Sequence, residues 1–162
     1  MKISRIIIWA GFVVIVLVFA YHYRVFAKAD VPQITFLGSP DAGKEKAVFS
    51  SWNEAQLLPV VRRVNWFDFA FVFFYVAILF MLSNRQVRKE SSVVLNALLR
   101  ANFFFVVVAG LVDLIENSFL LYNTYHWNDD FINVWWVTWL KFLLVGWTVL
   151  VWLVSFVKTR VK

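Results

Sequence analysis

The chain has 162 residues, of which 62% are hydrophobic, 20% aromatic and only 16% charged. Soluble domains are about half apolar and about a quarter charged, so this composition excludes an ordinary soluble domain and predicts an integral membrane protein. The formal net charge of +6 in so apolar a chain indicates membrane topology, and no nucleic-acid partner is expected. The chain has no cysteine, which excludes disulfides, thiolate metal sites and thiol chemistry.

Four apolar stretches predict transmembrane helices, at about residues 5–23, 66–83, 97–122 and 134–157. A helix needs about 20 residues to cross a hydrocarbon core of ~30 Å. The last three stretches are long enough, and the first becomes so when His22 and Tyr23 are counted with it. The expected fold class is therefore all-α, a four-transmembrane-helix bundle in which residues 1–162 form a single integral membrane domain.

The first stretch has a second interpretation, as a cleaved signal peptide. Lys2 and Arg5 form a basic start, and residues 27–29 have the small-x-small pattern of a cleavage site. The polar segment that follows Tyr21 is long for such a signal. We therefore favour a retained membrane anchor.

Basic residues gather on one side of the predicted bundle. The two termini and the connection between the second and third helices, together with Arg100 just inside the third helix, carry nine basic residues and one acid, Glu90. The opposite side has six basic and four acidic residues in its long first connection, and Asp129 and Asp130 without any lysine or arginine in the third connection. The positive-inside rule then predicts a multi-pass protein of the inner (plasma) membrane with both termini cytoplasmic.

Residues 24–65 form the expected extracytoplasmic loop of about 40 residues. The loop opens with an extended pattern at residues 31–37. From Ala42, apolar residues three or four apart predict a short amphipathic helix that Pro59 ends or kinks. Two placements stay open: a cap on the bilayer surface, with Phe49 and Trp52 dipping into the interface, or a lid over a cavity between the helices. We favour the surface cap.

The informative side chains are the ionisable ones at membrane depth. Such a group costs at least ~2.5–3.5 kcal/mol in hydrocarbon on insertion scales, so it faces the bundle interior and finds a partner. Asp113, Glu116 and Asn117 are three or four residues apart and share one helix face. Lys141 lies ~10 Å inside the fourth helix, at a depth that matches these acids. We therefore expect Lys141 to pair with Glu116 or Asp113.

The same cluster takes further candidates from the second and third helices. Asp68 and Tyr75 share a face of the second helix, and Asn102 lies on the acidic stripe of the third, beside small residues that allow close helix packing. The candidate ligand-binding or proton-relay residues are Asp68, Tyr75, Asn102, Asp113, Glu116, Asn117 and Lys141. A purely structural role, in which these groups only hold the helices together, stays open beside the functional role that we favour.

Other features are weaker signals of function. His22 and His126 lie near the outer interface but lack the spacing of metal ligands, so no metal site is expected. The sequence has no phosphate-binding glycine loop and no nucleophile elbow, and the cofactor, if one exists, is unknown.

Two patterns resemble those of small, uncharacterised bacterial four-helix integral membrane proteins. The first is W…D-F-x-F-x-x-x-Y, which ends at Tyr75, and the second is A-x-x-x-D-x-x-E-N, which ends at Asn117. The resemblance covers roughly residues 34–121. It implies a four-helix membrane architecture and transfers no activity and no residue role.

Three functional classes fit these observations. The first is a binding or accessory membrane protein that engages a lipid, a small apolar ligand, a membrane partner or a second copy of itself. The second is a proton-linked transporter or channel with Asp113, Glu116 and Lys141 as a relay. The third is an intramembrane enzyme acting on a lipid-like substrate, with Asp113 or Glu116 as acid or base. We favour the first class, because four helices without inverted repeats are few for a transporter and no nucleophile is evident.

Overall fold

A computed structural model describes residues 2–28 and 39–161 of the chain, and over these residues every regular element is a helix. In chain order these are α1 (Lys2–Lys28), α2 (Ala42–Glu54), α3 (Leu58–Val87), α4 (Val93–His126) and α5 (Trp135–Val161). All but α2 are long and apolar enough to cross a membrane. The all-α class and the four long apolar helices are thus confirmed, whereas the extended pattern at residues 31–37 lies outside the described residues.

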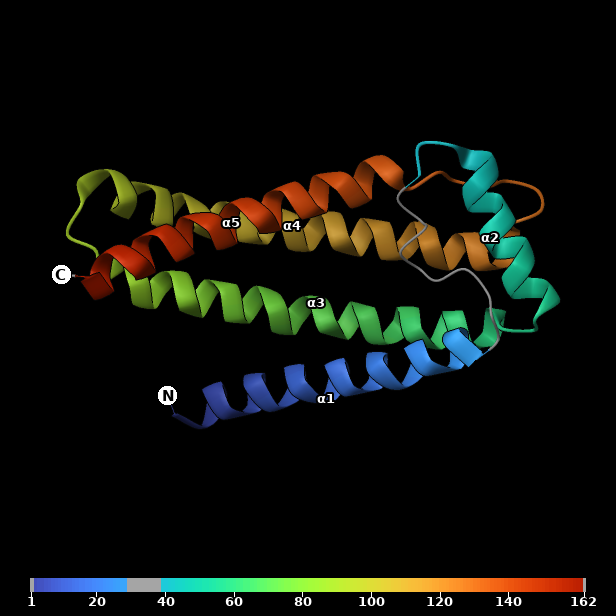
Figure 1. Cartoon of the computed structure of the whole chain (residues 1–162), viewed down its shortest axis with the longest axis horizontal. Coiled ribbons are helices and arrows are strands. Elements are labelled where there is room, and N and C mark those ends of the chain that lie inside the picture. The colour runs from blue at the N-terminus through green and yellow to red at the C-terminus, as the bar shows by residue number, and fades with distance from the viewer. Residues whose placement is uncertain (1, 29–38, 162) are drawn as a thin grey trace.

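The long helices run roughly side by side, and α2 lies across one end of them (Figure 1). We call this the cap end; it also holds the connection between α4 and α5. The opposite, terminal end holds the start of α1, the α3–α4 connection and the end of α5. The central helix is α4, which packs extensively against both α3 and α5, whereas α1 packs against α3.

The helix boundaries correct the predicted loop. α3 begins at Leu58 rather than near residue 66. Residues 58–65, which were expected in the loop, therefore form the first two turns of a long helix. Pro59 neither kinks nor ends a helix. It lies in the first turn of α3, where its missing N–H would have had no intrahelical partner. The preceding helix α2 ends at Glu54, and the chain turns at Gln56, whose φ of 54° is left-handed.

Two glycines allow close helix packing. A Cβ atom on Gly110 of α4 would lie 2.8 Å from Val76 Cγ2 of α3, and one on Gly11 of α1 would lie 2.2 Å from Phe74 Cε1. Both distances are shorter than an ordinary carbon–carbon contact, so a larger residue at either position would have to displace the side chain of Val76 or Phe74. The expectation that the acidic stripe of the third helix faces a neighbour through small residues is therefore confirmed.

The cap end has a core of its own, into which α2 turns its apolar face. Phe49 and Trp52 are completely buried. The ring of Phe49 lies 4.9 Å from that of Trp52 and 5.4 Å from that of Phe131, and Trp52 also contacts Phe26 of α1. The prediction that Phe49 and Trp52 dip into the membrane interface is therefore wrong. Protein side chains, rather than lipid, cover the apolar face of α2.

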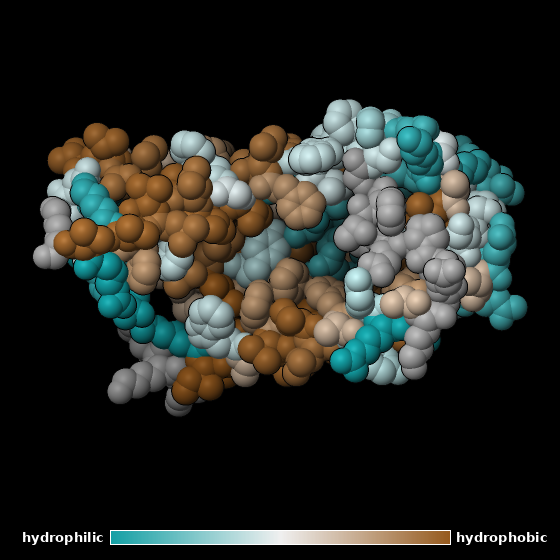
Figure 2. Space-filling model, in the orientation of Figure 1, coloured by the Kyte–Doolittle hydropathy of each residue, from teal (hydrophilic) through white to brown (hydrophobic). Residues whose placement is uncertain are grey.

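The surface divides into two zones along the long axis (Figure 2). Hydrophobic side chains cover much of the long helices, and hydrophilic ones gather at the cap end. Exposed apolar residues such as Leu17 of α1 and Leu143 of α5 are more than 60% accessible. Since soluble monomers rarely expose such large apolar areas, lipid is the medium that these faces fit.

Removing the Trp52 side chain should loosen the cap end. We expect Trp52→Ala to lower stability by about 3–5 kcal/mol, because a fully buried indole is replaced by a cavity. Trp66→Ala is the matched control, since the Trp66 side chain is 62% exposed. Thermal unfolding in detergent would measure both variants, and equal losses for the two would contradict the burial of Trp52 beneath α2.

Candidate functional site

The inward face of α4 supplies most of the candidate site. Asn102 and Asn117 are completely buried, and Asp113 and Glu116 are each 4% exposed. The sequence places the last three together because side chains three and four apart on a helix share a face. In a bundle that has hydrocarbon outside it, that face turns toward the neighbouring helices.

Lys141 of α5 reaches both acids of α4. Its Nζ lies 3.1 Å from Asp113 Oδ1, and the same ammonium forms an ion pair with Glu116 Oε2. The side chain of Lys141 is 15% exposed, against 5% and 6% for the two acids. The predicted pairing is confirmed, and the single ammonium of Lys141 forms ion pairs with both carboxylates.

Thr138 completes the contact on the side of the cap end. Its hydroxyl donates to Glu116 Oε1 at 2.7 Å, one helical turn before Lys141. The sequence analysis missed Thr138, because a hydroxyl in a helix usually bonds to a backbone carbonyl of its own helix. Thr138 also does this, toward Val134 O at 3.2 Å.

From the other side, α3 brings Asp68 and Tyr75 to the cluster. Both side chains are half-buried. Asp68 lies beside Asn117 and within electrostatic reach of Lys141, and Tyr75 lies beside Asp113. We call the group formed by Asp68, Tyr75, Asp113, Glu116, Asn117, Thr138 and Lys141 the polar cluster.

Two further asparagines tie the helices near this cluster. Asn65 of α3, which the sequence analysis assigned to the loop, donates to the backbone carbonyl of Asn117 at 2.8 Å. Asn102 donates to Thr148 O of α5 at 3.0 Å. Eleven residues separate Asn102 from Asp113, or about 16 Å along α4, so the structure does not bring Asn102 into the polar cluster.

Several buried polar atoms in this region have no hydrogen-bond partner among the described residues. They include both the oxygen and the nitrogen of the Asn117 side chain and the hydroxyl of Tyr75. More than nine in ten buried polar groups in proteins are hydrogen-bonded to protein, water or ligand. The Asn117 amide and the Tyr75 hydroxyl, which lie beside the carboxyl groups of Asp68 and Asp113, are therefore the candidate ligand-binding groups of the polar cluster.

The polar cluster lies between helices that are not closely packed everywhere. α3 and α5 contact each other much less than either contacts α4. On the face shown in Figure 2, a hollow opens between α3 and α5, and hydrophilic side chains lie at its bottom among apolar ones. The open side of this hollow is lateral, which in a membrane is the direction of the lipid.

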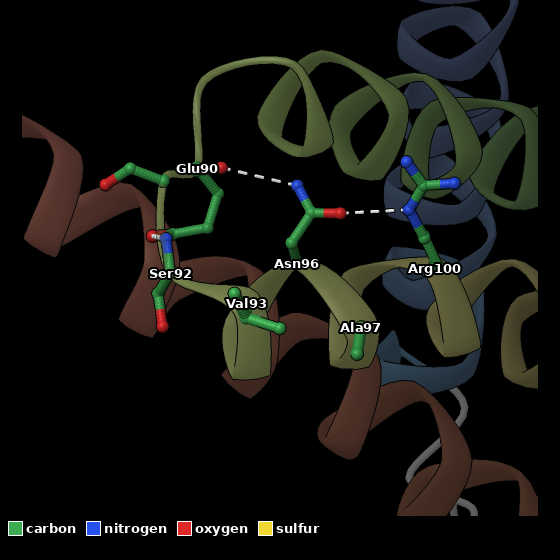
Figure 3. Close-up of a pocket in the computed structure, with 7 residues that line it drawn as sticks. Glu90, Ser92, Val93, Asn96, Ala97 and Arg100 are labelled. Atoms are coloured by element: carbon green, nitrogen blue, oxygen red, sulfur yellow. Dashed lines mark hydrogen bonds between the residues drawn. The ribbon is translucent and has the colours of Figure 1, made fainter.

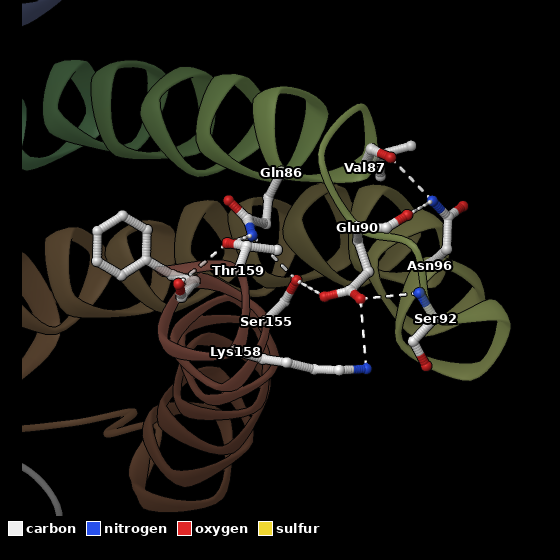
Figure 4. Close-up of polar contacts among 9 residues, drawn as sticks. Gln86, Val87, Glu90, Ser92, Asn96, Ser155, Lys158 and Thr159 are labelled. Atoms are coloured by element: carbon white, nitrogen blue, oxygen red, sulfur yellow. Dashed lines mark hydrogen bonds and ion pairs between the residues drawn. The ribbon is translucent and has the colours of Figure 1, made fainter. Parts of the chain in front are cut away.

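A second polar group, which the sequence analysis did not predict, links the helices at the terminal end (Figure 4). Glu90 of the α3–α4 connection accepts hydrogen bonds from the Ser155 hydroxyl of α5 and from the Ser92 N–H, and Lys158 Nζ lies 3.5 Å away. Gln86 donates to Ser155 and Thr159. The bond from Ser155, followed by that from Ser92, holds the pKa of Glu90 below its ordinary value. Each member has a partner, so this group fastens α5 to the connection.

A shallow cleft of about 360 Å³ lies next to that fastening, at the start of α4 (Figure 3). Its side chains bond mainly to one another: Asn96 donates to Val87 O and Glu90 O, and its carbonyl oxygen accepts from Arg100 Nε. Their bonding capacity is thus largely used within the protein. The polar cluster, with its unpartnered buried atoms, is the stronger candidate site.

Neither histidine contributes to a metal centre among the described residues, where no group of three or more histidine, aspartate or glutamate side chains is arranged to hold an ion. His22 Nδ1 lies 2.8 Å from Val18 O, and His126 Nδ1 lies 3.2 Å from Tyr122 O.

No protein-family model, curated protein or solved structure matches the chain. The resemblance to small bacterial membrane proteins therefore stays a prediction.

A double-mutant cycle tests the ion pairs of Lys141. We expect Lys141→Met to cost about 3–5 kcal/mol, because two buried carboxylates lose their shared cation. Glu116→Gln should cost less, since Asp113 still pairs with Lys141 and the amide oxygen still accepts from Thr138. The double variant should recover part of the loss of Lys141→Met, as measured by unfolding in detergent.

The matched control for this cycle is Lys158→Met on the same helix. The Lys158 side chain is 38% exposed and pairs with Glu90 at the terminal end, so its loss should cost about 0–1 kcal/mol. Strictly additive losses for the Lys141 and Glu116 changes would show that these two residues are not coupled.

Proposed function

We propose that this protein is a membrane binding protein that holds the polar head of an amphipathic ligand at the polar cluster. The head carries a positive charge or several hydrogen-bond donors. The carboxylates of Asp113 and Glu116 both contact the single ammonium of Lys141, and the carboxyl group of Asp68 lies within its electrostatic reach, so acceptors and negative charge are in excess in the cluster. A protonated amine attached to an apolar chain fits this balance and the surrounding helices.

The observation that carries the proposal is the side chain of Asn117. It is completely buried, it lies beside Asp68, and neither of its polar atoms has a hydrogen-bond partner among the described residues. A buried amide that serves only to hold helices together would bond to a neighbouring helix, as Asn65 and Asn102 do. The Asn117 side chain instead makes no such bond to a neighbouring backbone and lies beside the carboxyl group of Asp68, where a ligand could bond to both groups.

The hollow between α3 and α5 supports a lateral route to this site. Hydrophobic side chains border it along the long helices, and hydrophilic groups lie at its bottom (Figure 2). An amphipathic molecule in the bilayer would therefore leave its chain among apolar side chains while its head reaches the polar cluster. This geometry favours a ligand that arrives from the lipid phase.

We further propose that the chain lies in the inner (plasma) membrane with both termini in the cytoplasm. The basic side chains at the terminal end support this orientation through the positive-inside rule. The cap end, with α2 and the acidic pair Asp129 and Asp130, then faces outward.

A proton relay is the second candidate function. Thr138, Glu116, Lys141 and Asp113 form a continuous series of contacts across the interface of α4 and α5. Such a series can pass a proton between carboxylates. The lateral hollow and the free amide of Asn117 favour ligand binding over this alternative.

Native mass spectrometry of protein extracted in a mild detergent tests the proposal. The wild type should carry a bound small molecule, and dodecylamine added to the ligand-free protein should bind and raise its unfolding temperature. Dodecanoate, with the same chain and the opposite charge, should not. We expect Asn117→Leu, which keeps the shape and removes both polar atoms, to weaken dodecylamine binding at least tenfold.

Asn84→Leu is the control for this experiment, because Asn84 is an exposed asparagine on α3 far along the helix from the cluster. Equal binding of the amine and the carboxylate, or unchanged binding in Asn117→Leu, would contradict the proposal. Proton uptake by liposomes that contain the protein and a pH-sensitive dye would instead support the relay.

The orientation can be tested by labelling with an impermeant maleimide, since the chain has no cysteine of its own. Single cysteines at the exposed positions Asn53 and Asn128 of the cap end should react in intact cells. A cysteine at Ser91, in the connection at the terminal end, should react only after lysis. Labelling of position 91 alone in intact cells would reverse the orientation.

A further inference from the structure

Glu45 is a buried acid on a helix that otherwise presents its polar residues to solvent. Its residue exposure is 0%, and its Oε2 accepts a hydrogen bond at 3.3 Å from the N–H of Val134, the residue just before α5. Its Oε1 is buried without a hydrogen-bond partner among the described residues. A carboxyl group thus holds α2 against the start of a transmembrane helix.

Two other polar contacts between the cap segment and the bundle lie at its edge. Lys46 Nζ donates to Asn128 O at 2.7 Å in an exposed contact, and Asn133 Nδ2 lies 3.4 Å from Pro40 O just before α2. Such exposed bonds contribute little, because water replaces them easily. Within the described part of the chain, the apolar core and the carboxyl of Glu45 are buried contacts that hold α2 against the bundle.

Glu45 is also connected to the polar cluster. The charge of Glu116 acts on it. In addition, the N–H of Val134 donates a hydrogen bond to Glu45, and the carbonyl of Val134 accepts one from the Thr138 hydroxyl. The same hydroxyl also donates to Glu116. Three hydrogen bonds through Val134 and Thr138, together with the charge of Glu116, therefore connect α2 to the polar cluster.

The pKa of Glu45 is raised to about 7, and burial is the main cause. The hydrogen bond from Val134 lowers this pKa, whereas the charge of Glu116 raises it further. Asp68 and Lys141 belong to the polar cluster beside Glu116. Nearby charged or titratable groups have other partners: Arg62 of α3 bonds to Thr124, His22 of α1 to Val18, His126 of α4 to Tyr122 and Lys46 of α2 to Asn128. Asp129 and Asp130 are exposed.

The direction of the pH effect follows from the raised pKa. An undocked, exposed glutamate titrates near 4.5, whereas the docked one titrates near 7, so the docked state binds the proton more tightly. Docking is fully favoured below about pH 4.5. As the pH rises from there to about 7, the ratio of docked to undocked α2 falls by up to about tenfold per pH unit, and above that range it stays constant.

We propose that α2 is a proton-controlled cap, in which protonated Glu45 seals the cap end over the polar cluster and loss of that proton releases α2. The inference rests on the proposed binding function in one respect, namely that the cap closes the aqueous side of a ligand site that opens laterally to the lipid. The release of α2 itself does not depend on any ligand.

Pairs of spin labels measure the position of α2 directly. The labels are placed at Asn53→Cys on the exposed face of α2 and at Asp129→Cys on the α4–α5 connection, in an otherwise cysteine-free chain. Electron–electron distance measurements at pH 4.5 should give one narrow distance. At pH 8 a second, longer population should appear, with the ratio of docked to undocked protein at least tenfold lower.

Glu45→Gln is the decisive variant, because its amide can still accept from Val134 and never carries a charge. It should keep the narrow distance at both pH values. Glu54→Gln, at an exposed acid of the same helix, should respond to pH as the wild type does. A label pair at the terminal end, Asn84→Cys with Val161→Cys, should report the same distance throughout and so exclude global unfolding.

Two outcomes would overturn the cap: identical wild-type distances at pH 4.5 and pH 8, or a pH response that survives in Glu45→Gln. The two proposals fail separately. A cap that responds to pH in a protein that binds no dodecylamine rejects the binding function alone. Binding of dodecylamine by a protein whose α2 does not move rejects the cap alone.

Discussion

The ion pairs of Lys141 with Asp113 and Glu116 are the contact on which the arrangement of the bundle depends. An ionisable group surrounded by hydrocarbon must find a partner, and this requirement fixes which faces of α4 and α5 meet. Once α4 turns its acids toward α5, Gly110 falls on the side where Val76 of α3 approaches closely. One electrostatic constraint therefore orients the central helix toward both neighbours.

The polar group around Glu90 and the polar cluster differ in how completely their side chains are hydrogen-bonded and paired. At the terminal end, Glu90 is surrounded by donors from two segments, so its charge is fully compensated and the group acts as a fastening. In the polar cluster the acids outnumber the amine, and a completely buried amide, that of Asn117, has unused bonding capacity. Stability alone does not explain an arrangement of the second kind, because each unpartnered buried polar group costs about 1–3 kcal/mol.

The sequence was sufficient for the long helices and for the contact of Lys141 with the acids, because both follow from residue spacing and from the length needed to cross a bilayer. It misplaced the apolar face of α2, since an amphipathic helix shows the same periodicity whether Phe49 and Trp52 meet lipid or protein. Thr138 and Glu45 were missed for a related reason. Their roles arise from segments far apart in the chain, and nothing in the local pattern of either residue indicates its distant partner.

The joint between α2 and α3 gives the cap a mechanical property. Three residues, 55–57, separate the helices, and the N–H of Leu57 bonds back to Trp52 O at 2.7 Å, while Gln56 adopts a left-handed conformation. With only three residues between the helices, a movement of α2 must be taken up by rotation about the backbone bonds of residues 55–57 or of the adjoining helix ends. These residues are therefore the hinge that the proposed cap would use, and Asp68 lies about 15 Å from the start of α3.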